Sequence, residues 1–180
     1  NRPLLLHVHT TKGKGFKYAE QNATAFHSPK PFEVVEDKIK TRSSGRSFTA
    51  AFSDALSDLM CSDERIVAAT AAMPDGTGID KVMEKFPSRV WDTGICESHT
   101  LDMLAGMAKT GCKPFFAVYS TFLQRAFDQV FQEVALQGLP VRFCLDRAGV
   151  VGGDGSVHHG FCDIALLRVF PNAAIMAAID

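Results

Sequence analysis

The chain has 180 residues, of which 46% are hydrophobic and 22% are charged, and its 19 basic residues nearly balance its 20 acidic residues. This composition is ordinary for a globular protein with one packed core and room for appended segments. A formal net charge of −1 excludes the strongly basic field that attracts nucleic acid or an anionic membrane surface. We therefore expect neither as a partner.

The five cysteines form no C-x-x-C pair, and most of them lie in apolar runs. This pattern predicts reduced, buried thiols in a cytoplasmic protein rather than a disulfide framework. No apolar stretch reaches the roughly 18–20 residues of a membrane-spanning helix, and no signal-peptide pattern is present, so we expect neither a membrane span nor secretion. Because the first residue is not Met and the last residues read as a strand, the sequence predicts an internal fragment of a longer chain.

The N-terminal part begins with residues 4–10, an apolar and β-branched run that predicts a strand. Lys14 follows between Gly13 and Gly15, which let the backbone approach an anion that the ammonium group can meet. A solvated basic loop is the other interpretation, and the spacing of a Walker loop is absent. Residues 21–46 lose all periodicity and are rich in Pro, Ser, Gly and charge, which predicts a linker.

From residue 47 onward, apolar strand-like runs alternate with helical periodicity. The spacing predicts strands at 66–72, 89–93, 113–119, 140–146 and 174–178. It predicts helices at 47–61, 79–86, 97–110, 121–137 and 161–167, with a Gly-rich loop at 149–160. This alternation indicates an α/β fold with a mainly parallel, doubly wound sheet.

Polar and aromatic residues follow the ends of several expected strands. In a parallel sheet the loops after successive strands meet at one edge, where ligands bind. Arginines there can bind phosphate or carboxylate, and His and Asp can transfer protons. The residues expected at this edge are Glu97, His99, Tyr119, Ser120, Phe122, Arg125, Asp146, Arg147, Asp154, His158 and His159.

Each residue also has a plainer interpretation when it is taken alone. Glu97 can simply be an acid in the first turn of a helix, where the macrodipole favours negative charge. Phe122 can be a core residue and Arg125 a solvated helix charge. A zinc site at 158–163 is disfavoured, because no second ligand pair occurs at structural spacing. Only the convergence of these residues on one edge favours a functional site.

Several motifs together resemble the 1-deoxy-D-xylulose-5-phosphate synthase family. They are the run 119–130 (YSTFLQRAFDQV), the turn 146–149 (DRAG), the Gly-Asp-Gly turn before His158, and the segments 71–74 and 11–20. The motifs keep their order over nearly the whole chain. The resemblance implies a transketolase-like fold in which residues 1–20 end the diphosphate-binding domain, 21–46 form the linker and 47–180 form the pyrimidine-binding domain.

The same resemblance implies the chemistry. It implies a thiamine-diphosphate-dependent synthase that condenses pyruvate with glyceraldehyde 3-phosphate and releases carbon dioxide, at the start of the non-mevalonate isoprenoid pathway and also supplying thiamine biosynthesis. It further implies a homodimer, and a Mg²⁺ ion whose ligands belong to the N-terminal domain rather than to this fragment. The fragment alone is expected to be inactive.

Site roles follow from the resemblance, residue by residue. Glu97 matches the glutamate that bonds the aminopyrimidine nitrogen, and Phe122 matches the aromatic side chain that stacks on that ring. Lys14 and Phe16 match positions near the cofactor. Glu97, Asp154 and His158 are the expected catalytic residues. The residues expected around the acceptor substrate are Tyr119, Arg125, Arg147, Asp154 and His158.

Three positions depart from the family pattern. Ser98 stands where the family usually has Gln, Phe16 where many members have Tyr, and Gly153 where Ala is frequent. The competing hypotheses are another thiamine-diphosphate enzyme, such as a transketolase or a 2-oxoacid dehydrogenase β-type subunit, and a non-catalytic α/β module. The run 119–130 argues against the first, and the presence of Glu97 argues against the second.

Overall fold

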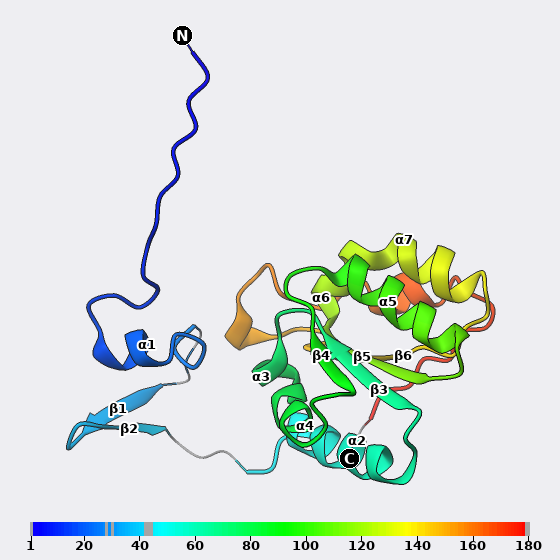
Figure 1. Ribbon diagram of the computed structural model, residues 1–180, viewed down its shortest axis with the longest axis horizontal. Helices are drawn as coiled ribbons and strands as arrows, with labels where there is room; N and C mark the ends of the chain where they lie inside the picture. The colour runs from blue at the N-terminus through cyan, green and yellow to red at the C-terminus, as the bar shows by residue number, and fades with distance from the viewer. Residues whose placement is uncertain (1, 28, 30, 42–44, 179–180) are drawn as a thin grey trace. The chain divides into compact units, whose positions relative to one another are not determined.

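The computed structural model describes residues 2–27, 29, 31–41 and 45–178. The chain forms two compact units, Asn1–Gly45 and Arg46–Asp180. The larger unit contains a parallel sheet with the strand order β4-β3-β5-β6 (Figure 1). Its strands are β3 (Ile66–Thr70), β4 (Val90–Asp92), β5 (Lys113–Tyr119) and β6 (Arg142–Asp146). The expected α/β fold with a parallel sheet is therefore confirmed.

Helices cover both faces of this sheet (Figure 1). Helices α2 (Phe48–Ser62) and α4 (Ile79–Lys85) pack on one face. Helix α5 (Glu97–Lys109) packs on the other, together with the segment from α6 (Ser120–Leu123) to η2 (Val130–Ala135). The short helices of this unit are α3 (Pro74–Thr77), η1 (Gln124–Ala126), α7 (Phe127–Gln129), η3 (Gly152–Asp154) and α8 (Asp163–Leu167).

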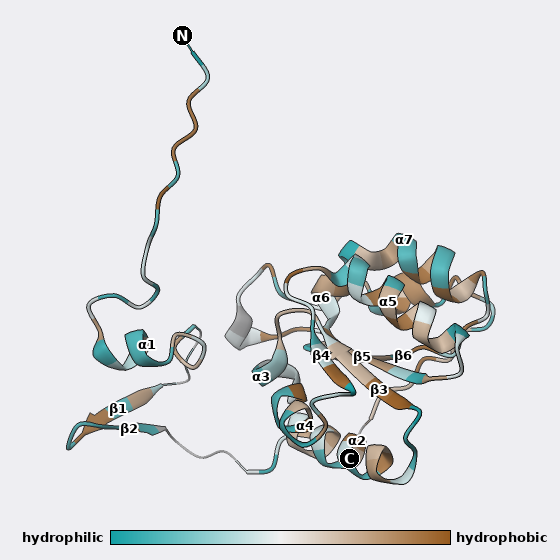
Figure 2. Ribbon diagram, in the orientation of Figure 1, coloured by the Kyte–Doolittle hydropathy of each residue, from teal (hydrophilic) through white to brown (hydrophobic). Residues whose placement is uncertain are grey.

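Two apolar cores share the sheet because neighbouring side chains of a strand point to opposite faces. In β3, Ile66 and Ala68 join the core under α2 and α4, whereas Val67 and Ala69 join the core under α5. All five residues of β3 are buried. Figure 2 shows β3 and β5 as largely apolar strands between helices with polar outer faces. Near-continuous apolar strands are typical of a parallel sheet that is covered on both sides.

The helix predicted at 121–137 is broken into four short pieces in the structure. Ala126 departs from helical geometry, with φ −107° and ψ 16°, and Val130–Ala135 forms a π-helix. The carbonyl of Arg125 accepts a hydrogen bond from the hydroxyl of Ser98 on α5, 3.1 Å away. This contact fixes the turn just before the irregular residue to a neighbouring helix. Hydrophobic periodicity alone cannot reveal such a tertiary contact.

The smaller unit contains helix α1 (Lys17–Gln21) and an antiparallel hairpin of β1 (Phe32–Val35) and β2 (Lys38–Thr41). The turn between the two strands places Glu36 and Asp37 at φ 48° and 61°. Such left-handed pairs match the twist of a two-residue hairpin. This hairpin was not predicted from the sequence, because no glycine marks the turn at Glu36 and Asp37.

Two predicted strands are absent from the described residues. Residues 2–11 have no regular element, and Leu4, Leu5 and Leu6 are exposed by 87%, 93% and 76%. Residues 173–178 are likewise irregular. A strand needs a hydrogen-bonded neighbour, and an apolar run predicts only that one would be favourable. In the described part of the chain, no helix is long and apolar enough to cross a membrane.

Candidate active site

Most of the predicted site residues lie in the larger unit, at the carboxyl edge of its sheet. Glu97 is the first residue of α5, after β4, and Tyr119 ends β5. Arg147 follows directly after β6. These are the positions at which open α/β sheets bind ligands.

Glu97 is buried, with a residue exposure of 1%. Its carboxylate accepts a hydrogen bond from Nη1 of Arg125 at 2.5 Å. The Arg125 side chain is 54% exposed, whereas that of Glu97 is 2% exposed. Burying a lone carboxylate is costly, so this arginine balances a charge that the fold has removed from water. The helix dipole favours a carboxylate in the first turn but does not require such burial, so it does not account for the ion pair with Arg125.

The side chain of Asp92 holds the turn that leads to Glu97. One oxygen of Asp92, Oδ1, accepts from the backbone N–H of Ala72 at 2.7 Å and of Gly94 at 2.9 Å. Gly94 has φ 77°, a conformation that glycine adopts without strain. Asp92 thereby joins the loop after β3 to the turn after β4.

A pair of hydroxyl groups anchors the first turn of α5 beneath Glu97. The Oγ1 atoms of Thr93 and Thr100 lie 2.6 Å apart, and Thr100 Oγ1 donates to the carbonyl of Cys96 at 2.9 Å. The Thr93 hydroxyl also lies 3.3 Å from the carbonyl oxygen of Thr70, at the end of β3, so the pair links the start of α5 to the neighbouring strand. Thr100 is fully buried, so these bonds fix the start of the helix without competition from water.

A row of stacked groups runs along the same edge. The Arg147 guanidinium lies 4.6 Å from the centre of the Tyr119 ring. Tyr119 stacks with Phe122 at a centroid distance of 5.9 Å, and the imidazole of His158 meets Phe122 edge-on at 5.4 Å. Four residues that the sequence analysis assigned to the cofactor and acceptor thus form a row in which each contacts the next.

Arg147 occupies a strained backbone position. Its φ is 58°, in the left-handed region that only a few per cent of non-glycine residues adopt. Asp146 holds it there: Oδ1 accepts from the Arg147 backbone N–H at 2.7 Å, and Oδ2 lies 2.9 Å from Nη1. Nη1 also donates to the carbonyl of Gly76 at 3.0 Å. Strain of this kind is concentrated at functional sites.

His158 belongs to a loop that is closed at its neck. The backbones of Gly149 and Gly160 exchange two hydrogen bonds of 3.0 and 2.9 Å. Inside the loop, His159 Nδ1 accepts from the N–H of Val151 at 2.9 Å, so this histidine has a structural role. Asp154 is the last residue of the short helix η3 in the same loop.

Lys14 and Phe16 lie in the smaller unit. Lys14 is part of a tight turn in which both neighbouring glycines have positive φ. Phe16 packs against Phe26 and Phe32, with ring centroids 5.6 and 6.1 Å away. Within this unit Phe16 is the centre of an aromatic cluster, a role that the sequence analysis did not predict.

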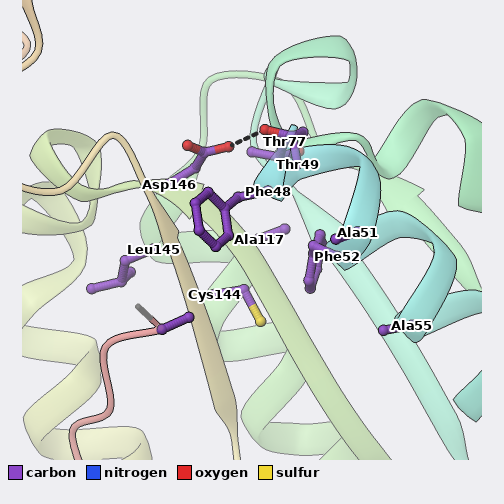
Figure 3. A pocket seen from close by; sticks show the side chains of 11 residues that line it. Phe48, Thr49, Ala51, Phe52, Ala55, Thr77, Ala117, Cys144, Leu145 and Asp146 are labelled. Atoms are coloured by element: carbon purple, nitrogen blue, oxygen red, sulfur yellow. Dashed lines mark hydrogen bonds between the residues drawn. The ribbon is translucent and has the colours of Figure 1, made fainter. Parts of the chain in front are cut away.

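A cavity of about 430 Å³, not predicted from the sequence, lies between α2 and the sheet (Figure 3). Thr49 Oγ1 donates to Asp146 Oδ2 at its mouth, across 3.2 Å. Burial raises the pKa of the Cys144 thiol, which lines the cavity, to about 11. The signal that could have revealed this cavity is a second apolar stripe on α2, formed by Phe48, Ala51, Phe52 and Ala55.

The family model of the transketolase pyrimidine-binding domain matches residues 44–180. The chain belongs to this family. A solved structure titled "Split gene transketolase, inactive beta4 tetramer" is similar, with a TM-score of 0.58 and 29% sequence identity. The match covers 68% of this chain and 39% of that chain.

Curated relatives named 1-deoxy-D-xylulose-5-phosphate synthase are similar along almost the whole sequence. The relative from Aliarcobacter butzleri is 49% identical over 179 residues, which are 99% of this chain and 30% of that protein. The relative from Heliobacterium modesticaldum is 52% identical over 178 residues, which are 99% of this chain and 28% of that protein. The chain therefore spans less than a third of the length of these relatives.

Within the pyrimidine-binding unit, the fold brings together most of the predicted residues but gives some of them unexpected contacts. His99 is exposed, and no hydrogen bond or ring contact joins it to the others in the described residues. Ser120 donates to Asp163 at 2.5 Å and so joins α6 to α8 rather than taking part in the row of stacked groups. No group of three or more His, Cys, Asp or Glu residues that could hold a metal ion occurs among the residues described. Asp92, Thr93 and Thr100 support the site from positions that no motif identified.

Proposed function

We propose that this chain is part of a 1-deoxy-D-xylulose-5-phosphate synthase and holds the aminopyrimidine end of thiamine diphosphate. The reaction is the condensation of pyruvate with glyceraldehyde 3-phosphate to 1-deoxy-D-xylulose 5-phosphate and carbon dioxide, which feeds isoprenoid and thiamine biosynthesis. The names of the relatives support the reaction. The observation that carries the proposal is the burial of the Glu97 carboxylate at the carboxyl edge of the sheet.

The residues around Glu97 fit this cofactor chemically. A buried carboxylate can share a proton with a ring nitrogen, and Phe122, one turn before Arg125, offers an aromatic face for an aminopyrimidine. When bound, thiamine diphosphate supplies the electron sink that a 2-oxo acid needs to lose carbon dioxide. Glu97 holds the proton at the pyrimidine nitrogen, and the low exposure around it keeps water from competing for that proton.

The row of stacked groups serves the acceptor. Arg147 and Arg125 offer planar, permanently charged donors that suit a phosphate group. Tyr119 packs beside Phe122, while His158 and Asp154 handle protons at the acceptor carbonyl. Because Arg125 also bonds Glu97, it lies between the cofactor side and the acceptor side of the proposed site.

Other parts of the whole protein complete the proposal. We propose that residues 1–20 end the diphosphate-binding domain, with Lys14 and Phe16 approaching the cofactor, and that 21–46 form the linker to the pyrimidine-binding domain at 47–180. The Mg²⁺ ligands belong to the N-terminal domain. The protein acts as a homodimer in the cytoplasm.

The test uses the full-length protein that contains this chain. It should consume pyruvate together with glyceraldehyde 3-phosphate, and Glu97→Gln should abolish turnover while the far-UV circular dichroism spectrum is retained. Glu84→Gln, at an exposed position of α4, is the matched control and should behave as the wild type. Wild-type turnover by Glu97→Gln would refute the proposed role of this residue.

A transketolase is the competing function, since a transketolase structure resembles the unit. Offering a ketose phosphate in place of pyruvate separates the two reactions, and turnover only with the ketose donor would contradict the synthase. The isolated 180-residue chain should be inactive in both assays because it lacks the partner domains of the cofactor site.

A further inference from the structure

Gly76 lies in the short helix α3, in the loop after β3, where it contacts the row of stacked groups. A Cβ atom at this position would overlap the hydroxyl oxygen of Tyr119 and would lie 2.7 Å from Cζ and 3.1 Å from Cε1 of that ring. Contacts under 3.0 Å force a movement, since side-chain carbons essentially never approach so closely. Any side chain at position 76 therefore displaces Tyr119.

The Tyr119 ring cannot move aside without cost. The Arg147 guanidinium lies over it at 4.6 Å, and Phe122 stacks with it at an interplanar angle of 14°. A swing of the ring breaks at least one of these contacts. A methyl group on residue 76 thus acts on the Arg147 contact through Tyr119.

The backbone of Gly76 makes a second contact with the same row. Its carbonyl oxygen accepts a hydrogen bond from Nη1 of Arg147 at 3.0 Å. Arg147 is held in its left-handed conformation on the other side by Asp146. One glycine therefore contacts two of the residues that we assign to the acceptor, Tyr119 and Arg147.

Helix propensity does not explain glycine at this position. Gly76 is not among the glycines with positive φ, so alanine could adopt its backbone conformation. In a helix, glycine is less stable than alanine by roughly 1 kcal/mol. The space that Tyr119 occupies is the remaining reason for glycine.

We propose that Gly76 is a positioning residue for the acceptor: its missing side chain and its carbonyl together set Tyr119 and Arg147 for an anionic, phosphate-bearing substrate. This inference rests on the proposed function for the identity of the acceptor. It extends that function by assigning a part in acceptor recognition to Gly76, in the loop after β3. Gly76 has no side chain that could bind the acceptor directly.

The test compares Gly76→Ala with Gly106→Ala in the full-length protein. Gly106 is also helical, but a Cβ there meets nothing within 4 Å. For Gly76→Ala we expect kcat/KM for glyceraldehyde 3-phosphate to fall on the order of 10²-fold, mainly through KM. The KM for pyruvate and the affinity for thiamine diphosphate should keep their wild-type values. Gly106→Ala should leave all of these quantities unchanged.

A double-mutant cycle with Tyr119→Phe tests the proposed route. Removing the overlapping hydroxyl should make Gly76→Ala less harmful to acceptor KM than it is in the wild-type background. Equal losses in acceptor, pyruvate and cofactor binding would indicate a merely structural role and overturn the inference. An unchanged acceptor KM, or strict additivity in the cycle, would overturn it as well.

Binding of inorganic phosphate separates this inference from the proposed function. If the wild-type protein does not condense pyruvate with glyceraldehyde 3-phosphate, the proposed function fails. Calorimetric titration with inorganic phosphate still measures the affinity of the protein for the anion that Arg147 is proposed to bind. Weaker phosphate binding by Gly76→Ala than by Gly106→Ala supports the positioning role. Equal binding, or no binding by the wild type, overturns it.

Discussion

The Arg125 guanidinium and the Glu97 carboxylate form an ion pair of 2.5 Å between a half-exposed cation and a fully buried anion. The two partners are therefore not equivalent. Without Arg125, the carboxylate of Glu97 is left in the interior without its counter-ion, whereas without Glu97, Arg125 can turn to water. The family resemblance suggested an acceptor role for Arg125, which stays a prediction. The ion pair gives Arg125 a second role, as the counter-ion of the buried Glu97 carboxylate.

Arg125→Ala should lower the free energy of unfolding by about 1–3 kcal/mol, because it leaves a buried charge without its hydrogen bond. Glu97→Gln should lower the free energy of unfolding by less, since the side-chain carbonyl oxygen of a buried glutamine can still accept a hydrogen bond from Arg125. Urea denaturation of the full-length variants measures both. Arg168→Ala is the control, since no acidic group of the described chain pairs with that exposed arginine. A larger loss for Glu97→Gln than for Arg125→Ala would contradict the asymmetry.

Gly160→Ala should open the neck of the loop that holds His158. A Cβ at Gly160 would lie 2.7 Å from the carbonyl oxygen of Arg147 and would overlap the Ser120 hydroxyl. We expect kcat/KM for the acceptor to fall on the order of 10²-fold. Gly153→Ala, in the same loop but with nothing within 4 Å of the added atom, should keep wild-type kinetics. Equal kinetics for the two variants would show that the neck does not position His158.

Asp63 should give the larger unit a measurable dependence of stability on pH. Hydrogen bonds from Arg65, and then from Lys113, hold the pKa of this carboxyl well below its ordinary value of 3.8. The unfolded chain therefore binds the proton more readily, so the stabilisation is complete above pH 3.8 and is lost as pH falls toward the folded pKa.

The measurement compares urea midpoints of Asp63→Asn and the wild type across this range. The variant should be less stable at pH 7, and the difference should shrink as the solution is acidified below pH 3.8. Asp58→Asn is the control, because Asp58 is exposed on α2 and pairs with no cation in the described part of the chain. If the difference between the urea midpoints of Asp63→Asn and the wild type stayed constant with pH, the ion-pair explanation would be ruled out.

Ser47→Ala should destabilise α2. The Ser47 Oγ atom accepts from the N–H of Ala50 at 3.1 Å and caps the helix. Loss of such a cap costs about 1 kcal/mol, which urea denaturation can resolve. Ser57→Ala lies within the same helix and should be neutral or stabilising, because alanine is the better helix former there. A neutral Ser47→Ala would mean that packing alone holds the start of α2.

The sequence predicted the central sheet because its strands are short apolar runs between helical segments. The run that became β3 could be recognised without a structure, since burial on both faces leaves four apolar residues in succession before Thr70. The N-terminal run at 4–10 looks equally strand-like. A strand also needs a second segment to which its backbone is hydrogen-bonded, and the periodicity of one segment does not show whether that partner is present.

The part of the site that could be predicted consists of residues at the carboxyl ends of strands. Glu97, Tyr119 and Arg147 follow strands directly, so topology places them on one edge. The ion pair of Glu97 spans 28 residues, and the overlap that excludes a side chain at Gly76 depends on the position of a ring 43 residues away. Neither relation leaves a periodic signal, because each is set by packing between elements.

The burial of β5 on both sides has a consequence for how this domain can change. Phe116 and Val118 belong to the core under α5, whereas Ala117 belongs to the core under α2 and α4. A slip of the strand by one residue would exchange large and small side chains between the two cores and would carry Tyr119 off the edge. Insertions and deletions in this strand are thus incompatible with the packing of both cores and with the acceptor role proposed for Tyr119. We therefore expect the domain to tolerate changes of length only in loops that leave the register of β5 intact.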